Sequence, residues 1–229
     1  MNPKVIEALK RSRYKIITDK DDLEKVYRLR YKCYHAEGAI SEDASAIMSD
    51  ALDEAPNCVH VAIELDGKIA AAMRLHLLSK LSLRSPTLDV FPELLDHLEQ
   101  GQTSLDPTRF VIDPAARKMS VPLHFLALRI PFLAAMFYDI DLALASVRTE
   151  HIPFYRRYLG YELAIKARSY PGLKKPLHLL TANFREQRDA VLARTPVFGP
   201  MDGFPNASIA FPVLSKVYVA SKEGRSKAA

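Results

Sequence analysis

An Asp66-Gly67 pair stands between two long apolar runs, CVHVAIEL (58–65) and KIAAAMRLHLL (68–78). Asp-Gly supplies the backbone conformations that a two-residue hairpin turn requires, and both runs are rich in residues that favour strands. The two runs therefore predict an antiparallel hairpin. Helix and strand signals alternate along the chain on both sides of it.

Eleven further segments carry strand or helix patterns. Strands are predicted at 14–18, 108–113, 141–147, 161–168 and 175–182, and helices at 3–11, 19–34, 91–99, 121–138, 151–160 and 183–194. The polar stretch 36–57 is predicted to be a loop with a short helix. This order predicts an α/β sandwich in which helices flank a central sheet.

The predicted domain spans residues 1–194, and a Pro/Gly-rich extension follows at 195–229. The closing SKEGRSKAA (221–229) is polar and is expected to be disordered. The start of the chain lacks the apolar run of a signal peptide, and the longest apolar stretch (125–136) is too short to span a bilayer. Two cysteines make no disulfide framework, so we expect a protein of the reducing cytoplasm.

Charge is distributed unevenly along the chain, which carries a formal net charge of +5. Residues 36–113 are acidic, whereas 114–175 hold ten Lys or Arg against four acids. A basic surface attracts an acidic partner, and an acidic carrier protein and a nucleic acid both fit. A solvated basic face without a partner explains the charge equally well.

No helix-turn-helix or zinc motif in the sequence supports nucleic-acid binding, and no His or Cys pair has the spacing of metal ligands.

Arg74 lies within an apolar strand and Arg109 at the start of another. Burying a guanidinium costs free energy unless an acid pairs with it. The natural candidates for these partners are Asp50, Asp53 and Asp106. These five residues predict either a buried network of ion pairs or a polar site.

Five ordered motifs surround these charges: LRYKCY (29–34), DALD (50–53), AMRLHL (72–77), FPELL (91–95) and LDPTRFVID (105–113). Together they resemble the acyl-homoserine-lactone synthases and their relatives, the N-acyl amino acid synthases, over about residues 14–182. The resemblance implies an N-acetyltransferase-like (GNAT) three-layer sandwich with a mixed central sheet. It also implies an N-acyltransferase that moves a fatty acyl chain from acyl carrier protein to an amine.

The resemblance also implies roles for individual residues. A charged cluster would order the loop over the site and help to hold the acceptor, two aromatic residues and a threonine would line it, and Asp106 stands where the family has glutamate. The implied substrate-binding residues are Arg30, Tyr34, Asp50, Asp53, Arg74, Phe91 and Thr149, and Asp106 and Arg109 are the implied catalytic pair.

Three departures from the family pattern bear on the acceptor. Ile40 stands where the family has tryptophan, Tyr34 replaces phenylalanine, and Asp106 is shorter than glutamate. The lost tryptophan removes a large apolar wall from the acceptor pocket. The changes favour an amino acid or similar amine over the S-adenosylmethionine of the lactone synthases.

The stretch DPAARKMSVPLHFL (113–126) bears on the acyl donor. Coenzyme A enzymes of this fold cradle a pyrophosphate on glycine-rich N–H groups at a helix start. The stretch has no glycine, and Pro122 lacks an N–H. We therefore expect an acyl-phosphopantetheine thioester on an acidic carrier protein, docked on the basic segment 114–175, and no permanently bound cofactor.

The expected reaction is direct attack of the amine on the thioester carbonyl. Asp106, directly or through water, would take the ammonium proton, and N–H groups at 109–111 would hold the oxyanion. Tyr155 and its neighbour Tyr158 are candidates for protonating the thiolate, and His151 and His124 are alternative bases. Three alternatives stay open: a lactone synthase, a coenzyme A-dependent N-acetyltransferase, and a non-catalytic module that binds acyl carriers.

Overall fold

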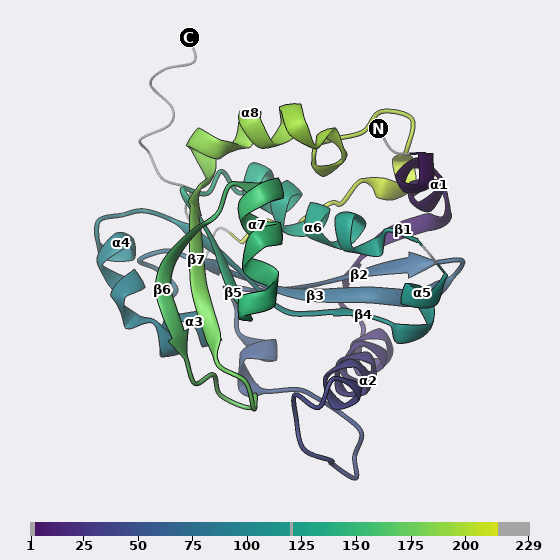
Figure 1. Ribbon diagram of the computed structural model, residues 1–229, viewed down its shortest axis with the longest axis horizontal. Coiled ribbons are helices and arrows are strands. Elements are labelled where there is room, and N and C mark those ends of the chain that lie inside the picture. The colour runs from purple at the N-terminus through teal and green to yellow at the C-terminus, as the bar shows by residue number, and fades with distance from the viewer. Residues whose placement is uncertain (1–2, 120, 215–229) are drawn as a thin grey trace.

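The computed structural model describes residues 3–119 and 121–214 and has one seven-stranded sheet between two layers of helices (Figure 1). The strand order is β1-β2-β3-β4-β5-β7-β6, and β4 and β5 are parallel while all other neighbours are antiparallel. The strands are β1 (Ser12–Ile17), β2 (Cys58–Leu65), β3 (Lys68–Leu78), β4 (Ser104–Ile112), β5 (Leu142–Val147), β6 (Glu162–Arg168) and β7 (Leu177–Asn183). The helices are α1 (Pro3–Arg11), α2 (Lys20–Ala36), α3 (Pro86–Val90), α4 (Leu95–Glu99), α5 (Pro114–Lys118), α6 (Leu123–Phe137), α7 (Ile152–Leu159) and α8 (Phe184–Arg194). The predicted sandwich with a mixed sheet is confirmed.

The predicted hairpin is formed by β2 and β3, which pair from Cys58↔His76 to Leu65↔Lys68. Asp66 and Gly67 both have left-handed backbone conformations, with φ of 51° and 78°. This is the geometry that an Asp-Gly turn permits at low cost. The turn therefore sets the register of the pairs next to it, and the register shifts once, between Ile63 and Glu64.

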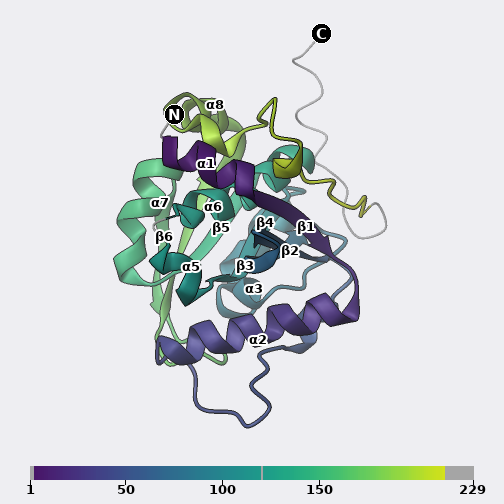
Figure 2. The same ribbon diagram turned by 90° about the vertical axis from the view of Figure 1, so that its right-hand side faces the viewer.

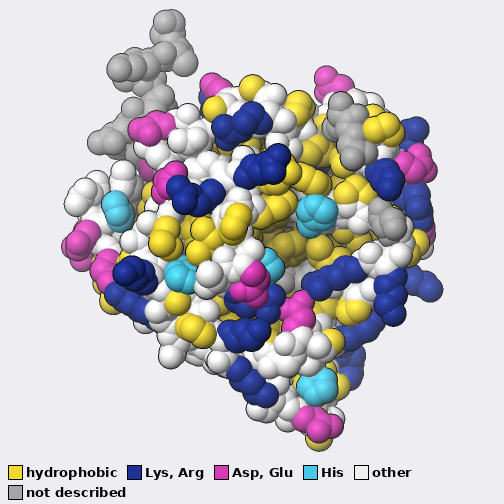
Figure 3. Space-filling model, viewed as in Figure 1, with side chains coloured by type: hydrophobic (Ala, Val, Ile, Leu, Met, Phe, Trp, Pro, Cys, Tyr) yellow, Lys and Arg dark blue, Asp and Glu magenta, His cyan; other side chains and the backbone are white. Residues whose placement is uncertain are grey.

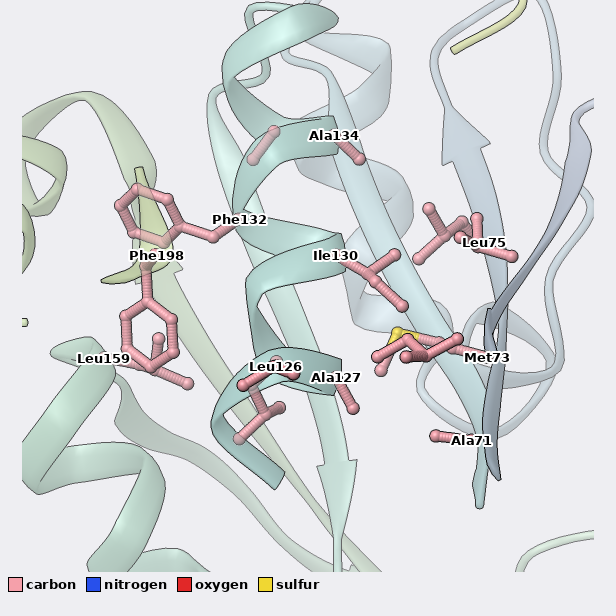
Figure 4. Packing of buried hydrophobic residues seen from close by; sticks show 14 of the residues in the cluster. Ala71, Met73, Leu75, Leu126, Ala127, Ile130, Phe132, Ala134, Leu159 and Phe198 are labelled. Atoms are coloured by element: carbon pink, nitrogen blue, oxygen red, sulfur yellow. The ribbon is translucent and has the colours of Figure 1, made fainter. Parts of the chain in front are cut away.

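Side chains of the hairpin alternate between two covered faces. Met73 and Leu75 of β3 pack against α6, where Figure 4 shows Ile130 pointing toward them. Ala72, on the opposite face, packs against α2 in a second cluster. Figure 2 shows α2 on one side of the sheet and α1, α6 and α8 on the other. Both faces of the sheet are buried, which explains why the strands are nearly continuous apolar runs.

The face that carries α2 also carries a polar layer. α2 begins at its N-cap Asp19, whose side chain accepts a hydrogen bond from the Asp22 N–H, and it covers one end of this face. The short helices α3 and α4 cover the other end through a cluster that contains Leu88 and Leu98. Between them, the polar side chains of β3 and β4 meet the short 3₁₀ helix at Ala51–Glu54.

The parallel pair β4–β5 is joined at one end only. It pairs through Ser104↔Leu142 and Leu105↔Ala143, although both strands continue for several residues. Beyond these two pairs the strands splay apart. The sheet is thus divided into β1–β4 and β5–β7, with an opening between the halves.

The segment that follows α8 packs onto the domain. Arg129 of α6 is fully buried and donates hydrogen bonds to the carbonyl oxygens of Gly199 and Ala207, and Phe198 stacks on Phe132 at 5.8 Å between ring centroids (Figure 4). Residues 196–211 therefore contribute to the same core as the predicted domain. The predicted disorder of 221–229 lies outside the described residues.

Burial also changes the predicted basic segment 114–175. Arg129 is one of its ten cations, but its side chain is inside the protein and does not contribute to the surface. Within residues 3–119 and 121–214, no helix is long and apolar enough to cross a bilayer.

Candidate active site

Three arginines and two aspartates form a largely buried cluster on the α2 face of the sheet. Arg30 binds Asp53 at 2.7 Å, and Arg74 binds Asp50 at 2.6 Å and Asp53 at 2.9 Å. Arg109 binds the second oxygen of Asp50 at 2.7 Å. Of the three acids expected to pair with the strand arginines, Asp50 and Asp53 do so, whereas the ion pairs of Arg74 and Arg109 in the described residues do not include Asp106.

The loop supplies its acids in a fixed geometry. Asp50 caps the 3₁₀ helix Ala51–Glu54, and the Asp53 side chain accepts a hydrogen bond from the Asp50 N–H, which makes a capping box. Burial would raise the pKa of Asp50, but hydrogen bonds and charge from Arg74 and Arg109 outweigh it and hold that pKa well below its usual value. Burial would likewise raise the pKa of Asp53, but Arg30 and Arg74 lower it. Both acids therefore stay ionised, and the cluster ties the loop 36–57 to the sheet.

Arg109 reaches the cluster from a distorted strand. The pairing of β3 with β4 shifts register between Ala72 and Arg74, so two residues of β4 stand opposite one of β3. Arg109 lies at this bulge with φ of 53°, a left-handed conformation that is strained for a residue with a long side chain. Its guanidinium lies 6.0 Å from the centre of the Tyr34 ring. The bulge turns Arg109 toward the opening between β4 and β5.

A cavity of about 510 Å³ occupies this opening. One end is bordered by charged and polar side chains. The other runs between α6, β7 and α8 and is mainly apolar, although Gln187 and Arg188 of α8 also line it. Figure 3 shows hydrophobic side chains gathered in the middle of this face, with Lys and Arg around them. The polar end is lined by Tyr34, Glu37, Arg109, Arg117, Arg148, His151, Tyr170 and Lys175, and the apolar end by Leu128, Phe132, Ala135, Leu159, Ala182, Phe184 and Val191.

Asp106 lies behind the cavity wall. Its neighbours Leu105 and Pro107 line the cavity, whereas its own carboxylate is fully buried on the α2 face and accepts a 2.8 Å hydrogen bond from Thr87. Burial raises the pKa of Asp106 to about 6, against the nearby hydroxyls of Ser85 and Thr87 and the charge of Arg74. Direct contact with an amine in the cavity, one of the two expected modes, does not fit this position.

The remaining predicted residues divide into two groups. Tyr34, Tyr155 and His151 line the cavity, and burial raises the pKa of Tyr155, which keeps its phenol protonated. Phe91 does not line it, because its ring is fully buried in the cluster that α3 and α4 form. Thr149 is exposed and bonds to His178, so it is also outside the cavity.

Sequence patterns missed three hydroxyl residues next to Asp106. Ser146 and Tyr170 line the cavity, and Thr87 lies between them and Asp106. Ser146 is the single hydroxyl residue of the apolar strand β5, and this was the one feature of the sequence that could have pointed to it. Tyr170 lies in the β6–β7 loop, where no periodicity marks it.

A helix-flanked mixed sheet with a substrate-sized cavity at a splayed parallel pair is the N-acetyltransferase-like architecture, and the protein is an acyltransferase. The family model of the N-acyl amino acid synthase FeeM matches residues 25–183, and the chain belongs to this family. No curated protein matches the chain in sequence.

Solved structures share this fold. FeeM, an N-acyl amino acid synthase from uncultured soil microbes, superposes with a TM-score of 0.67 at 16% identity, over 80% of this chain and 96% of that one. The CoA-dependent acyl-homoserine lactone synthase MesI gives 0.59 at 22% identity, over 84% and 98% of the two chains. A second such enzyme, BjaI, with S-adenosylmethionine (SAM) and isopentyl-CoA, gives 0.60 at 16% identity, over 83% and 91%. The expected fold and the expected family are both confirmed.

Proposed function

We propose that the protein is an N-acyl amino acid synthase, which moves a fatty acyl chain from a phosphopantetheine thioester to the amino group of an amino acid. The observation that carries the proposal is the cavity between β4 and β5, which is mainly apolar at one end and charged at the other. Its volume of about 510 Å³ lies in the usual range for ligand pockets, about 300–1,000 Å³. A long acyl chain fits the mainly apolar end, and its thioester carbonyl would then lie where β4 and β5 separate.

The charges at the polar end support an acceptor that carries a carboxylate. In the cluster, three guanidinium groups meet the two ionised carboxylates of Asp50 and Asp53, which leaves one positive charge. Arg109 lines the cavity while only one of its nitrogens is bound to Asp50. A guanidinium that faces a cavity is suited to binding a carboxylate in a bidentate manner.

The thioester carbonyl needs hydrogen-bond donors as it becomes an oxyanion. β4 loses its pairing with β5 after Leu105, so that its backbone from 107 to 112 borders the cavity on that side. We assign the oxyanion to N–H groups of residues 109–111. Tyr155, whose phenol stays protonated, is positioned on the cavity wall to give a proton to the leaving thiolate.

For the donor, we favour an acyl carrier protein over coenzyme A. The starts of α5 and α6 have proline at Pro114 and Pro122 and no glycine, which leaves few N–H groups for a pyrophosphate. Arg117, Lys175 and other exposed cations of 114–175 surround the polar end of the cavity, where an acidic carrier would dock. A cytoplasmic location, where such carriers are found, belongs to the same proposal.

The deciding experiment offers dodecanoyl-carrier protein, dodecanoyl-CoA and acetyl-CoA to the enzyme, with a panel of amino acids, their amides and SAM. Mass spectrometry should detect N-dodecanoyl amino acids, made fastest from the carrier-bound donor. Product from acetyl-CoA alone would contradict the fatty acyl donor. An acyl-homoserine lactone made from SAM in preference to every amino acid would establish the competing lactone synthase, whose fold the chain shares.

Two variants sharpen the assignment. Arg109→Ala should raise KM for leucine at least tenfold and leave KM for leucinamide unchanged, because only leucine carries the carboxylate. Lys175→Glu should raise KM for the carrier-bound donor more than KM for dodecanoyl-CoA, since the carrier offers an extended acidic protein surface. Lys10→Glu, on α1 and outside the cavity, is the charge-matched control.

A further inference from the structure

Thr87 joins the buried acid to the cavity through three hydrogen bonds. Its hydroxyl lies 2.8 Å from Asp106 Oδ1, 2.8 Å from Ser146 Oγ and 3.3 Å from the Tyr170 hydroxyl. The four side chains come from α3, β4, β5 and the β6–β7 loop. Thr87 and Asp106 are fully buried, whereas Ser146 and Tyr170 line the cavity. The group therefore spans the sheet from its inner polar layer to the substrate space.

The direction of these hydrogen bonds follows from the number of protons available. A hydroxyl has one proton and two acceptor lone pairs, and an ionised carboxylate can only accept. The Thr87 proton therefore goes to ionised Asp106, and Ser146 and Tyr170 must both donate to Thr87. Their remaining lone pairs are then acceptors on the cavity side. The ionised acid thus makes the cavity wall a receptor for N–H groups.

We propose that Thr87 is a positioning residue that relays a proton from the acceptor amine to Asp106. This step rests on the proposed function. The acceptor's ammonium loses a proton to Ser146 Oγ, the former Ser146 proton moves to Thr87, and the former Thr87 proton moves to Asp106 Oδ1. The products are a neutral amine, two unchanged hydroxyls and a neutral carboxylic acid.

The released nitrogen lone pair then attacks the thioester carbonyl. When the carbon–sulfur bond breaks, Tyr155 gives its proton to the leaving thiolate and regains one from the new amide nitrogen, which carries one proton too many. The Asp106 proton returns through Thr87 and Ser146 to solvent when the product leaves. Each turnover therefore yields one amide, one thiol and one released proton from one ammonium and one thioester.

The surroundings of Asp106 make it a suitable final acceptor. Arg74 and His76 face it from β3, and Tyr161 and Tyr170 face it from the two ends of β6. Burial lowers the pKa of His76 to about 3, so that Arg74 is the cation that favours the ionised acid. With a pKa of about 6, Asp106 is ionised at neutral pH yet takes a proton more readily than an ordinary aspartate.

The first test compares Thr87→Val, which removes the hydroxyl, with Thr87→Ser, which keeps it. At pH about 7, Thr87→Val should lower kcat/KM for an amino acid by about 10- to 100-fold, and Thr87→Ser should stay within about threefold. KM for the acyl donor should not change. Above the pKa of the acceptor's amino group the amine arrives neutral, so the deficit of Thr87→Val should shrink to about threefold or less.

The second test needs no substrate. The infrared carbonyl band of protonated Asp106, taken as wild type minus Asp106→Asn, should follow pH with a midpoint near 6. Ser146→Ala and Tyr170→Phe should each shift this midpoint or the band frequency, although neither side chain is bonded to Asp106 directly. Ser208→Ala, an exposed hydroxyl elsewhere, is the control and should leave the band unchanged.

The outcomes separate the relay from the proposed function. If wild type makes no N-acyl product from any donor and amine, the proposed function fails, and the infrared band still decides whether Asp106 is coupled to the cavity. If wild type is active but Thr87→Val shows the same deficit at every pH, the relay is refuted. An Asp106 band that is unchanged in Ser146→Ala and Tyr170→Phe refutes it as well.

Discussion

Asp106→Asn should make the protein more stable at neutral pH while removing the final proton acceptor. Burial raises the pKa of Asp106 from 3.8 to about 6, which means that its ionisation opposes folding. The difference of about two pH units, at ~1.4 kcal/mol per unit, corresponds to about 3 kcal/mol. Asparagine has the same shape, can accept from Thr87 and carries no charge, so the folded variant avoids this cost.

The direction of the pKa shift determines the pH range in which Asp106 lowers the stability of the wild type relative to the variant. Below about pH 4 the acid is protonated in both the folded and the unfolded chain, and ionisation contributes nothing. Between about pH 4 and pH 6 the folded chain keeps a proton that the unfolded chain has lost, so wild-type stability falls relative to the variant. Above about pH 6 the difference is constant.

Urea unfolding of both proteins at a series of pH values measures this difference. The new amide also carries a buried N–H₂ group, which adds an offset that does not depend on pH. Subtracting the stability difference at pH 4 from the stability difference at pH 8 cancels this offset. The subtraction also cancels the contribution of every group that titrates alike in both proteins. If the stability difference does not change between pH 4 and pH 8, or changes in favour of wild type, Asp106 does not have the raised pKa from which the prediction starts. At pH 8 the variant should also lose about 10²- to 10⁴-fold in kcat/KM.

Asp53→Ala should destabilise the protein by about 3–5 kcal/mol in urea unfolding, because it leaves buried Arg30 and Arg74 underpaired, whereas exposed Asp21→Ala should change stability by at most about 0.5 kcal/mol. Ala135→Leu, at the apolar end of the cavity, should shorten the preferred acyl chain in a competition among donors; Ala134→Leu, equally buried on the same helix but off the cavity wall, should not. Arg129→Met should expose residues 196–211 to limited proteolysis, because the carbonyls of Gly199 and Ala207 lose their donor, and uncut protein at wild-type protease doses would count against this role.

The elements and the charge pairs were predictable from local signals. The Asp-Gly turn, the acids at the start of α2 and the apolar runs each act over a few residues, and the structure confirms the elements that they predict. The need of Arg74 for acidic partners follows from burial alone, and Asp50 and Asp53 meet it. Helix α6 begins at Leu123 rather than at residue 121, because Pro122 serves as its N-cap.

The chemical arrangement of the site was less predictable, because it depends on contacts between distant segments. The bulge that turns Arg109 is a property of the β3–β4 pairing, and no residue near it signals a left-handed backbone. Thr87 lies 19 residues from Asp106 and 59 from Ser146 along the chain. Hydroxyl residues also occur throughout any sequence, so only the fold shows which of them meet.

The position of Arg129 has a consequence for the order in which the chain completes its fold during synthesis. Its carbonyl partners, Gly199 and Ala207, follow it by 70 and 78 residues. A nascent chain that has emerged only as far as α8 has made every strand of the sheet, yet the guanidinium on α6 still lacks these partners. Moreover, the 3₁₀ turn at Pro205–Ala207 packs against α1 and β1, the first elements to be made. The earliest and latest described parts of the chain therefore close the fold together, so its core is completed only after residue 207 has left the ribosome.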